Sequence, residues 1–291
     1  MPTASVNLSF RDQTSRPDGS VRFSWAGFSL ECVRIGHARA FDYDWEGPYH
    51  YLAVHDILMR DGELSVDGNT AAHCTDLRKR LTFVPQNARV SGWSELSGGD
   101  QGYAALFFDP GLMEAECERP ILGTAVRPLV YFENAVLCRT LRRLEALVAG
   151  EGEPEPVTAE TLCLLAVLQL YPALGGSFQQ DAGHLSLRQQ HAITDFIEAR
   201  LGSAISLSEL ADIAGLSRYH FARSFSRTYG RAPHQYVLLR RISLAAGLLT
   251  GSTLPISEIA IRAGFTSPAR LSIAFRRMVG CSPRDFRQAA L

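Results

Sequence analysis

Arginine side chains that recur at the spacing of one helix face are the most informative functional groups in this chain, because such a face can bind a polyanion. They occur in two short segments that begin at Arg218 and Pro268. Once the apolar positions are set aside, the remaining faces hold Arg218, Tyr219, His220, Ala222, Arg223 and Arg227 in the first segment, and Ala269, Arg270, Ile273, Arg276 and Arg277 in the second. A guanidinium can donate two hydrogen bonds to a guanine edge, and a helix fits the major groove of DNA. Two copies disfavour the alternative that these arginines only solubilise a surface helix.

The charge distribution singles out the same part of the chain. Residues 181–291 contain 14 arginines and 7 acidic residues, a balance of +7, whereas residues 1–180 have a balance of −8. This asymmetry predicts a polyanionic partner for the last third alone.

An internal repeat supplies the elements that would position these arginines. SELADIAGLS from Ser208 aligns with SEIAIRAGFT from Ser257 at an offset of 49, and the offset becomes 50 beyond the glycine. We therefore predict two helix-turn-helix units, at about 206–230 and 256–280, joined by one longer helix from Pro233 to Leu249.

Each copy contains the residues that such a turn requires. Gly215 and Gly264 can adopt the left-handed conformation that ends the first helix. Ser217 and Ser267 are suited to cap the second helix, and Ser206 or Ser208 would cap the first helix of the first unit.

Residues 187–291 resemble the DNA-binding domain of the AraC/XylS regulators. The resemblance rests on SELADIAGLSRYHFARSFSRTYG, PHQYVLLRRISLAAGLL and ISEIAIRAGFTSPARLSIAFRRMVGCSPRDFR. It implies a regulator, either an activator or a repressor, that binds double-stranded DNA, contacts RNA polymerase and forms a homodimer. By position it implies base contacts by Tyr219, Ala222, Arg223, Arg270 and Ile273, and we expect phosphate contacts from Arg218, Arg227, Arg276 and Arg277. Ile273 departs from the family pattern, because it offers only apolar contact where a polar residue is common.

The first two thirds of the chain have a different texture. We expect a loose arm over residues 1–20 and short antiparallel strands from Val21 to about Asp109, with turns at Asp61-Gly62, Asp67-Gly68 and Gly98-Gly99. The MRDGE segment is the clearest predicted hairpin. The fold class is thus α+β with two domains: an N-terminal antiparallel barrel, cupin-like by family resemblance, and an all-helical C-terminal domain.

A helical hairpin is predicted over residues 134–172. Its first helix carries an apolar stripe formed by Leu137, Leu141, Leu144 and Val148. The stripe either covers the sheet or forms a dimer interface, and both alternatives have equal weight at this point. The barrel and the hairpin make up a domain over 21–174, and a linker at 175–186 follows.

The N-terminal domain is expected to bind a small organic effector, with Trp45 and Trp93 as candidate pocket walls. The alternatives are a regulator without a ligand, whose N-terminal domain only dimerises, and a cupin-type metalloenzyme with a DNA-binding tail. We expect no metal and no other cofactor, because His37, His50, His55 and His73 lack cupin spacing. No catalytic motif or phosphate loop is present, so an enzyme is not expected.

The composition suits a protein of the cytoplasm. The six cysteines are scattered and should be reduced thiols. Neither a signal pattern nor an apolar run near the roughly 18 residues of a membrane span is evident, so no membrane partner is expected.

Overall fold

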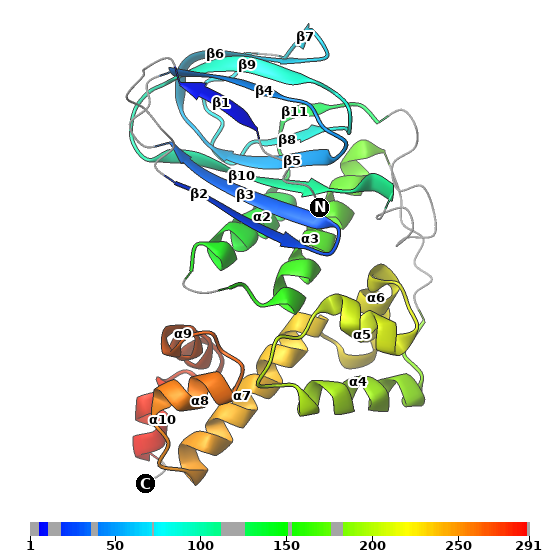
Figure 1. The fold of residues 1–291 in the computed structure, drawn as a ribbon, viewed down its shortest axis with the longest axis vertical. Coiled ribbons are helices and arrows are strands. Elements are labelled where there is room, and N and C mark those ends of the chain that lie inside the picture. The colour runs from blue at the N-terminus through cyan, green and yellow to red at the C-terminus, as the bar shows by residue number, and fades with distance from the viewer. Residues whose placement is uncertain are drawn as a thin grey trace. The chain divides into compact units, whose positions relative to one another are not determined.

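The computed structural model describes residues 6–10, 19–35, 40–71, 73–111, 126–150, 153–175 and 183–289 (Figure 1). The chain forms two compact domains. The N-terminal domain comprises Met1–Ala149 and Leu162–Gln179, and the C-terminal domain comprises Gly150–Thr161 and Gln180–Leu291. His37, Cys117, most of the predicted arm and residues 176–182 of the predicted linker lie outside the described residues.

Two antiparallel sheets form the N-terminal domain (Figure 1). The first has the strand order β1 (Asn7–Phe10), β4 (Ala40–Trp45), β9 (Val90–Leu96), β6 (Met59–Val66), β7 (Asn69–Thr70). The second has the order β11 (Leu129–Phe132), β8 (Leu81–Val84), β5 (His50–Asp56), β10 (Gln101–Phe108), β3 (Phe28–Ile35), β2 (Gly19–Trp25). Among the described strands none pairs across the two sheets, so the expected barrel is not closed.

A shared core lies between the two sheets. Phe41 and Trp45 of β4 face Tyr51 of β5 and Phe107 of β10, and the Trp45 and Phe107 ring centroids are 5.8 Å apart. Every residue of β10 is buried, because this strand has apolar neighbours on both faces.

Two turn predictions are confirmed and one is wrong. Asp67 and Gly68, with φ of 49° and 76°, connect β6 to β7, and Gly98 and Gly99 lie between β9 and β10. The predicted MRDGE hairpin is instead the start of β6, with a register shift between Met59 and Asp61. Gly62 is needed there for close approach, since a Cβ would lie 2.9 Å from the Trp93 carbonyl oxygen. The predicted arm is also not loose throughout, because β1 pairs with β4.

The predicted hairpin consists of α2 (Ala135–Val148) and α3 (Pro156–Leu170), followed by the 3-10 helix η1 (Tyr171–Leu174). Asn134 caps α2 by accepting hydrogen bonds from the backbone of Val136 and Leu137. The stripe on α2 is buried against β5 and β10: Leu137, Leu141 and Leu144 are 0% exposed and Val148 is 4% exposed. Covering the sheet therefore accounts for the stripe, and these four side chains are not available to a second chain.

No apolar run near the length of a membrane span was evident from the sequence, and Pro156–Leu174 corrects that expectation. Its length and its mean hydropathy of 1.5 would suffice to cross a membrane, and 56% of this segment is buried within the protein. Burial of this kind is also typical of a core helix.

The C-terminal domain is helical in all its described elements. They are α4 (Leu187–Ala199), α5 (Leu207–Ala214), α6 (Arg218–Tyr229), α7 (Pro233–Gly251), α8 (Ile256–Arg262), α9 (Pro268–Val279) and α10 (Pro283–Ala289). The helix-turn-helix pairs α5–α6 and α8–α9 and the connecting helix α7 occur where the repeat predicts them. A second core, around Ile242, Leu249, Ile259, Leu271 and Phe275, joins α7 to α8 and α9.

Candidate functional site

The first helix-turn-helix unit is fixed by its caps. Ser206 and Glu209 form a capping box at the start of α5, in which the Ser206 hydroxyl accepts from the Glu209 N–H and the Glu209 carboxylate accepts from the Ser206 N–H. Gly215 ends α5 with a φ of +65°. Ser217 then caps α6 by accepting a hydrogen bond from the His220 N–H at 3.3 Å. The turn between the helices is thus set by local chemistry.

On α6 the predicted DNA-contacting residues divide into two groups. Arg227 is exposed, and Ala222 and Arg223 are half-buried. Arg218 and Tyr219 are buried. The charge of Arg218 acts on the carboxylate of Glu160, so its predicted phosphate contact would require the side chain to leave this position.

Tyr219 contacts the arginine one turn further along α6. The Arg223 guanidinium lies 5.4 Å from the centroid of the Tyr219 ring, and its Nη1 donates a hydrogen bond to the Tyr219 hydroxyl. Two contacts of this kind restrict an otherwise mobile side chain. Tyr219 therefore positions Arg223 in this structure.

The second unit has the same plan with a longer turn. Gly264, with a φ of +77°, is separated from the α9 cap Ser267 by two residues, where the first unit has one between Gly215 and Ser217. This is the single-residue insertion that the change of offset predicts. Ser267 accepts from the Arg270 N–H at 3.3 Å, and Pro268 occupies the first helical position.

The outer face of α9 is open. Ile273 is 71% exposed, Arg276 and Arg277 are exposed, and Arg270 is half-buried. A single exposed apolar side chain is common on protein surfaces, so the exposure of Ile273 leaves it available for contact but does not by itself indicate a partner. The face combines charges suited to phosphates with an apolar group suited to a thymine methyl.

Residues 153–161 contribute contacts to the C-terminal domain that the sequence gave no reason to expect. Glu160 Oε2 accepts hydrogen bonds from the N–H groups of Leu207 and Ser208, at 2.9 and 3.2 Å, at the start of α5. Glu155 forms an ion pair with Arg241 of α7 at 3.2 Å. Burial raises the pKa of both carboxyl groups. No motif marks these two glutamates, because both interactions are made with residues far along the chain.

Arg241 is the centre of this set of contacts. The side chain is 4% exposed and donates hydrogen bonds to the carbonyl oxygens of Leu201 and Ser203, at 3.0 and 2.7 Å. These carbonyls lie in the loop between α4 and α5. One buried arginine thus fixes the loop that precedes the first helix-turn-helix unit.

A cavity lies between the two sheets of the N-terminal domain. Its volume is about 60 Å³, measured as the space that the centre of a water molecule can reach. The lining residues are predominantly apolar or aromatic: Val6, Leu8, Phe41, Tyr43, Trp45, Tyr51, His55, Ile57, Leu64, Leu77, Thr82, Val90, Ser94, Tyr103 and Tyr131. A water molecule needs roughly 10–15 Å³ by this measure, so several waters or a small ligand fit.

Of the two tryptophans predicted as pocket walls, Trp45 lines this cavity and Trp93 does not. Ser94, the next residue of β9, faces the cavity, and Trp93 lies on the opposite face of the strand. The inward alternation of Phe41, Tyr43 and Trp45 on β4 is the signal by which the wall could have been found.

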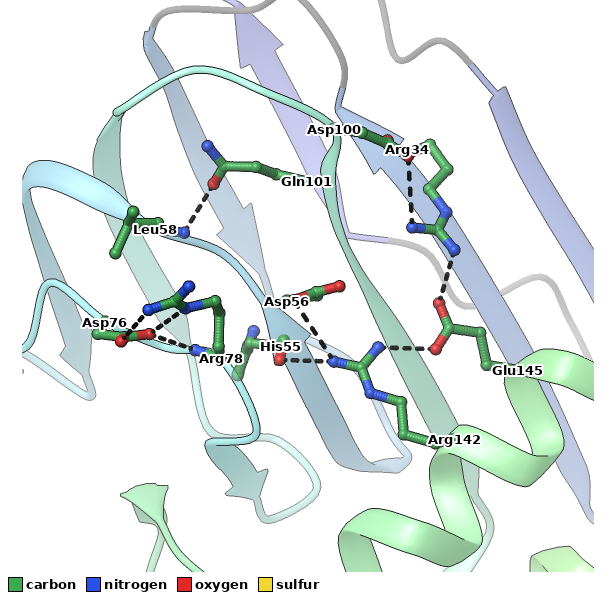
Figure 2. Close-up of polar contacts among 10 residues, drawn as sticks. All are labelled: Arg34, His55, Asp56, Leu58, Asp76, Arg78, Asp100, Gln101, Arg142 and Glu145. Atoms are coloured by element: carbon green, nitrogen blue, oxygen red, sulfur yellow. Dashed lines mark hydrogen bonds and ion pairs between the residues drawn. The ribbon is translucent and has the colours of Figure 1, made fainter.

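A polar network ties α2 to the sheet that carries His55 (Figure 2). Arg142 of α2 donates a hydrogen bond to the His55 carbonyl oxygen at 2.9 Å and pairs with Glu145 at 2.7 Å. The other carboxylate oxygen of Glu145 accepts from Arg34 of β3 at 3.3 Å. Helix α2 is therefore held to β3 and β5 by charged contacts in addition to its buried stripe.

Within the described residues the histidines and cysteines form neither a metal site nor a disulfide. His50 accepts from the Gln86 N–H and His55 Nε2 lies 3.0 Å from the Thr82 hydroxyl, so two of the four candidate histidines are hydrogen-bonded. Burial lowers the pKa of each to about 4. Within the described residues no group of three metal-ligating side chains occurs, and the five described cysteines are not in disulfides.

Comparisons with known proteins concern mainly the C-terminal domain. A family model described as "Helix-turn-helix domain" matches residues 210–289. The probable transcriptional regulator LumQ of Photobacterium leiognathi is 39% identical over 95 residues, which are 33% of this chain and 38% of LumQ. The chain therefore spans well under two thirds of that relative.

Two further matches extend over most of a shorter protein. The multiple antibiotic resistance protein MarA of Salmonella typhimurium is 33% identical over 97 residues, which are 33% of this chain and 76% of MarA. The DNA-binding domain of AdpA, solved with a target DNA, is 35% identical and covers 36% of this chain and 93% of that domain, with a TM-score of 0.34. The 33% identity over 76% of MarA and the match to the helix-turn-helix model show that this chain belongs to the AraC family.

Proposed function

We propose that this protein is a transcription regulator that binds double-stranded DNA through α6 and α9. The observation that carries the proposal is the pair of serine-capped helices, each with exposed arginine, in a part of the chain with a balance of +7. LumQ is named a probable transcriptional regulator, and the AdpA domain was solved with a target DNA. Both names agree with this function.

The proposal assigns two kinds of contact. Arg223, positioned by Tyr219, contacts a base edge, as do Ala222, Arg270 and Ile273. Arg227, Arg276 and Arg277 neutralise phosphates and release counterions from DNA, so they contribute affinity without sequence preference.

Selection of random DNA fragments with the purified full-length protein tests the function. Arg223→Ala should weaken binding to the selected site by about 1–3 kcal/mol and relax the base preference at one position. Arg227→Ala should weaken binding to all sequences alike and lower the dependence of affinity on salt concentration. Arg60→Ala is the matched control, because Arg60 is an exposed arginine of the N-terminal domain and should change neither. Failure to enrich any sequence would refute the proposal.

The N-terminal domain is proposed to be a cupin-like effector domain, with the cavity between its sheets as the effector site. The mainly apolar and aromatic lining and Trp45 at the wall of the cavity support this assignment. A ligand acts only through its differential affinity for two arrangements of the protein, and a coupling of about 1–3 kcal/mol would change DNA occupancy roughly 5–150-fold. A thermal-shift screen followed by DNA titration with each hit tests this part.

Homodimerisation, contact with RNA polymerase, activation and residence in the cytoplasm belong to the same proposal and derive from the family. Sedimentation of the purified protein at micromolar concentration tests the dimer. A monomer under those conditions would remove dimerisation from the proposal and leave DNA binding intact.

A further inference from the structure

The cavity between the sheets has no formal charge on its walls. Among its lining residues there is no aspartate, glutamate, lysine or arginine. The only titratable groups are His55 and four tyrosines. Burial lowers the pKa of His55 to about 4, and burial raises the pKa of Tyr43, Tyr51, Tyr103 and Tyr131. At neutral pH all five groups are uncharged, so an anion would lose its hydration without gaining an opposite charge. The charge of the buried Glu31, which helps to raise the pKa of Tyr51 and Tyr103, disfavours an anion further.

One polar group in this cavity lacks a partner. The side chain of Tyr103 is 6% exposed, and its hydroxyl makes no hydrogen bond to any described residue. The neighbouring polar groups are engaged: the Tyr43 hydroxyl donates to the Glu63 carbonyl oxygen at 3.0 Å, and His55 contacts Thr82. Leaving a buried hydroxyl unpaired destabilises a fold, and phenylalanine would fill the same space without that penalty.

The remaining walls suit a flat apolar body. Trp45 and Tyr51 have ring centroids 5.5 Å apart, and Phe41 lies on the same strand as Trp45, facing the same way. Aromatic walls bind aromatic rings by stacked and edge-to-face contacts. The cavity has room for a small compound.

We propose that the effector is a small, neutral, mainly aromatic compound whose one polar group hydrogen-bonds to the hydroxyl of Tyr103. The inference rests on the proposed effector role of this domain and specifies the chemistry of its ligand. The Tyr103 hydroxyl is kept at a cost in stability because the ligand uses it.

Titrations of the full-length protein with matched pairs of compounds test the proposal. Benzamide against benzoate, and indole-3-acetamide against indole-3-acetate, vary charge at nearly constant shape. NMR titration should show binding of each neutral member, and binding of each anion at least tenfold weaker. Tyr103→Phe should weaken benzamide binding about threefold to tenfold, the equivalent of one hydrogen bond, and leave toluene binding unchanged.

The same variant separates a ligand role from a structural one. Tyr103→Phe should melt at the same temperature as the unmodified protein or higher, because it removes an unpaired hydroxyl. Tyr49→Phe is the matched control, since Tyr49 is buried in the same core but does not line the cavity. It should leave every dissociation constant unchanged.

Three results would overturn the proposal. They are binding of the anions as tight as the neutral compounds, destabilisation by Tyr103→Phe, and no binding of any neutral aromatic probe. Selection of a specific DNA sequence in the same preparation would show that the proposed regulator stands while the ligand class is wrong.

Discussion

The two helix-turn-helix units share a plan but differ in what surrounds their turns. Gly215 has no atom within 4 Å of the position a Cβ would take, so only its φ of +65° calls for glycine. At Gly264 a Cβ would lie 2.1 Å from the Leu201 carbonyl oxygen and 2.7 Å from Arg241 Nε. The first turn lies against open space, whereas the second is packed against the loop that precedes the first unit.

The backbone segments before the two units also differ in how they are held. Arg241 binds the Leu201 and Ser203 carbonyls before α5, and Arg287 binds the Leu249 and Leu254 carbonyls before α8, at 3.3 and 2.7 Å. Arg241 is nearly inaccessible and also pairs with Glu155, whereas Arg287 is half-buried. A sequence repeat therefore does not imply equal energetic roles, because Arg241 serves the loop of one unit and the turn of the other.

The largest effect is expected at the second turn. Gly264→Ala should lower the free energy of unfolding by more than about 3 kcal/mol, because backbone strain adds to a clash with a backbone carbonyl. Gly215→Ala should lower it by about 1–2 kcal/mol, the penalty of the left-handed conformation alone. Urea unfolding of both variants measures the difference, and equal losses would contradict the comparison.

Removal of Arg241 should have an effect of similar size. Arg241→Met leaves Glu155 buried without its partner and should lower the free energy of unfolding by about 3–5 kcal/mol. Arg287→Met removes hydrogen bonds from a more exposed position and should lower it by about 1–3 kcal/mol. Glu155→Gln should recover part of the loss when combined with Arg241→Met. Strict additivity of those two substitutions in a double-mutant cycle would argue against the ion pair.

A third comparison concerns the DNA-contacting faces. Replacing Ile273 by alanine should weaken binding to the selected site by less than about 1 kcal/mol, because only an apolar contact is lost. This is below the range expected for Arg223→Ala. Binding isotherms at one fixed salt concentration compare the two variants. A larger effect at Ile273 would indicate that α9 contributes more to sequence recognition than α6.

Small effects, on stability rather than on DNA binding, are expected at the caps of α5 and α8. Ser206→Ala should lower the free energy of unfolding by about 1 kcal/mol, because it removes half of a capping box. Helix α8 begins after Pro255 without a side-chain cap, so Pro255→Ser should raise it by up to about 0.5 kcal/mol. Thermal unfolding detects both changes, and a destabilised Pro255→Ser would indicate that the proline is needed for the path of the chain.

The parts that the sequence predicted are those governed by local chemistry. Ser217, Gly215, Ser267 and Gly264 set the ends of their own helices, so the bounds of α6 and the longer second turn follow from residue type and spacing. Gly62 shows the limit of that approach, because it resembles a turn glycine but serves the approach of β9.

The rest depends on contacts between residues distant in sequence. The α2 stripe that contains Leu141 was compatible with a sheet or a partner, and only the fold decided between them. Tyr103 and Glu160 carry no motif, and their roles become evident only once the strands and helices are assembled. Helix α10 was not predicted.

The position of Glu155 and Glu160 determines where the protein can be cut. A fragment that starts at Leu187, as the repeat suggests, loses both carboxylates, leaves the Arg241 charge buried without its ion pair and removes two hydrogen bonds from the start of α5. The C-terminal domain is thus discontinuous in the chain, since Gly150–Thr161 belongs to it. Its independently folding part should accordingly include the segment Gly150–Thr161, which lies outside the repeat, and expression of the repeat alone should give a less stable product.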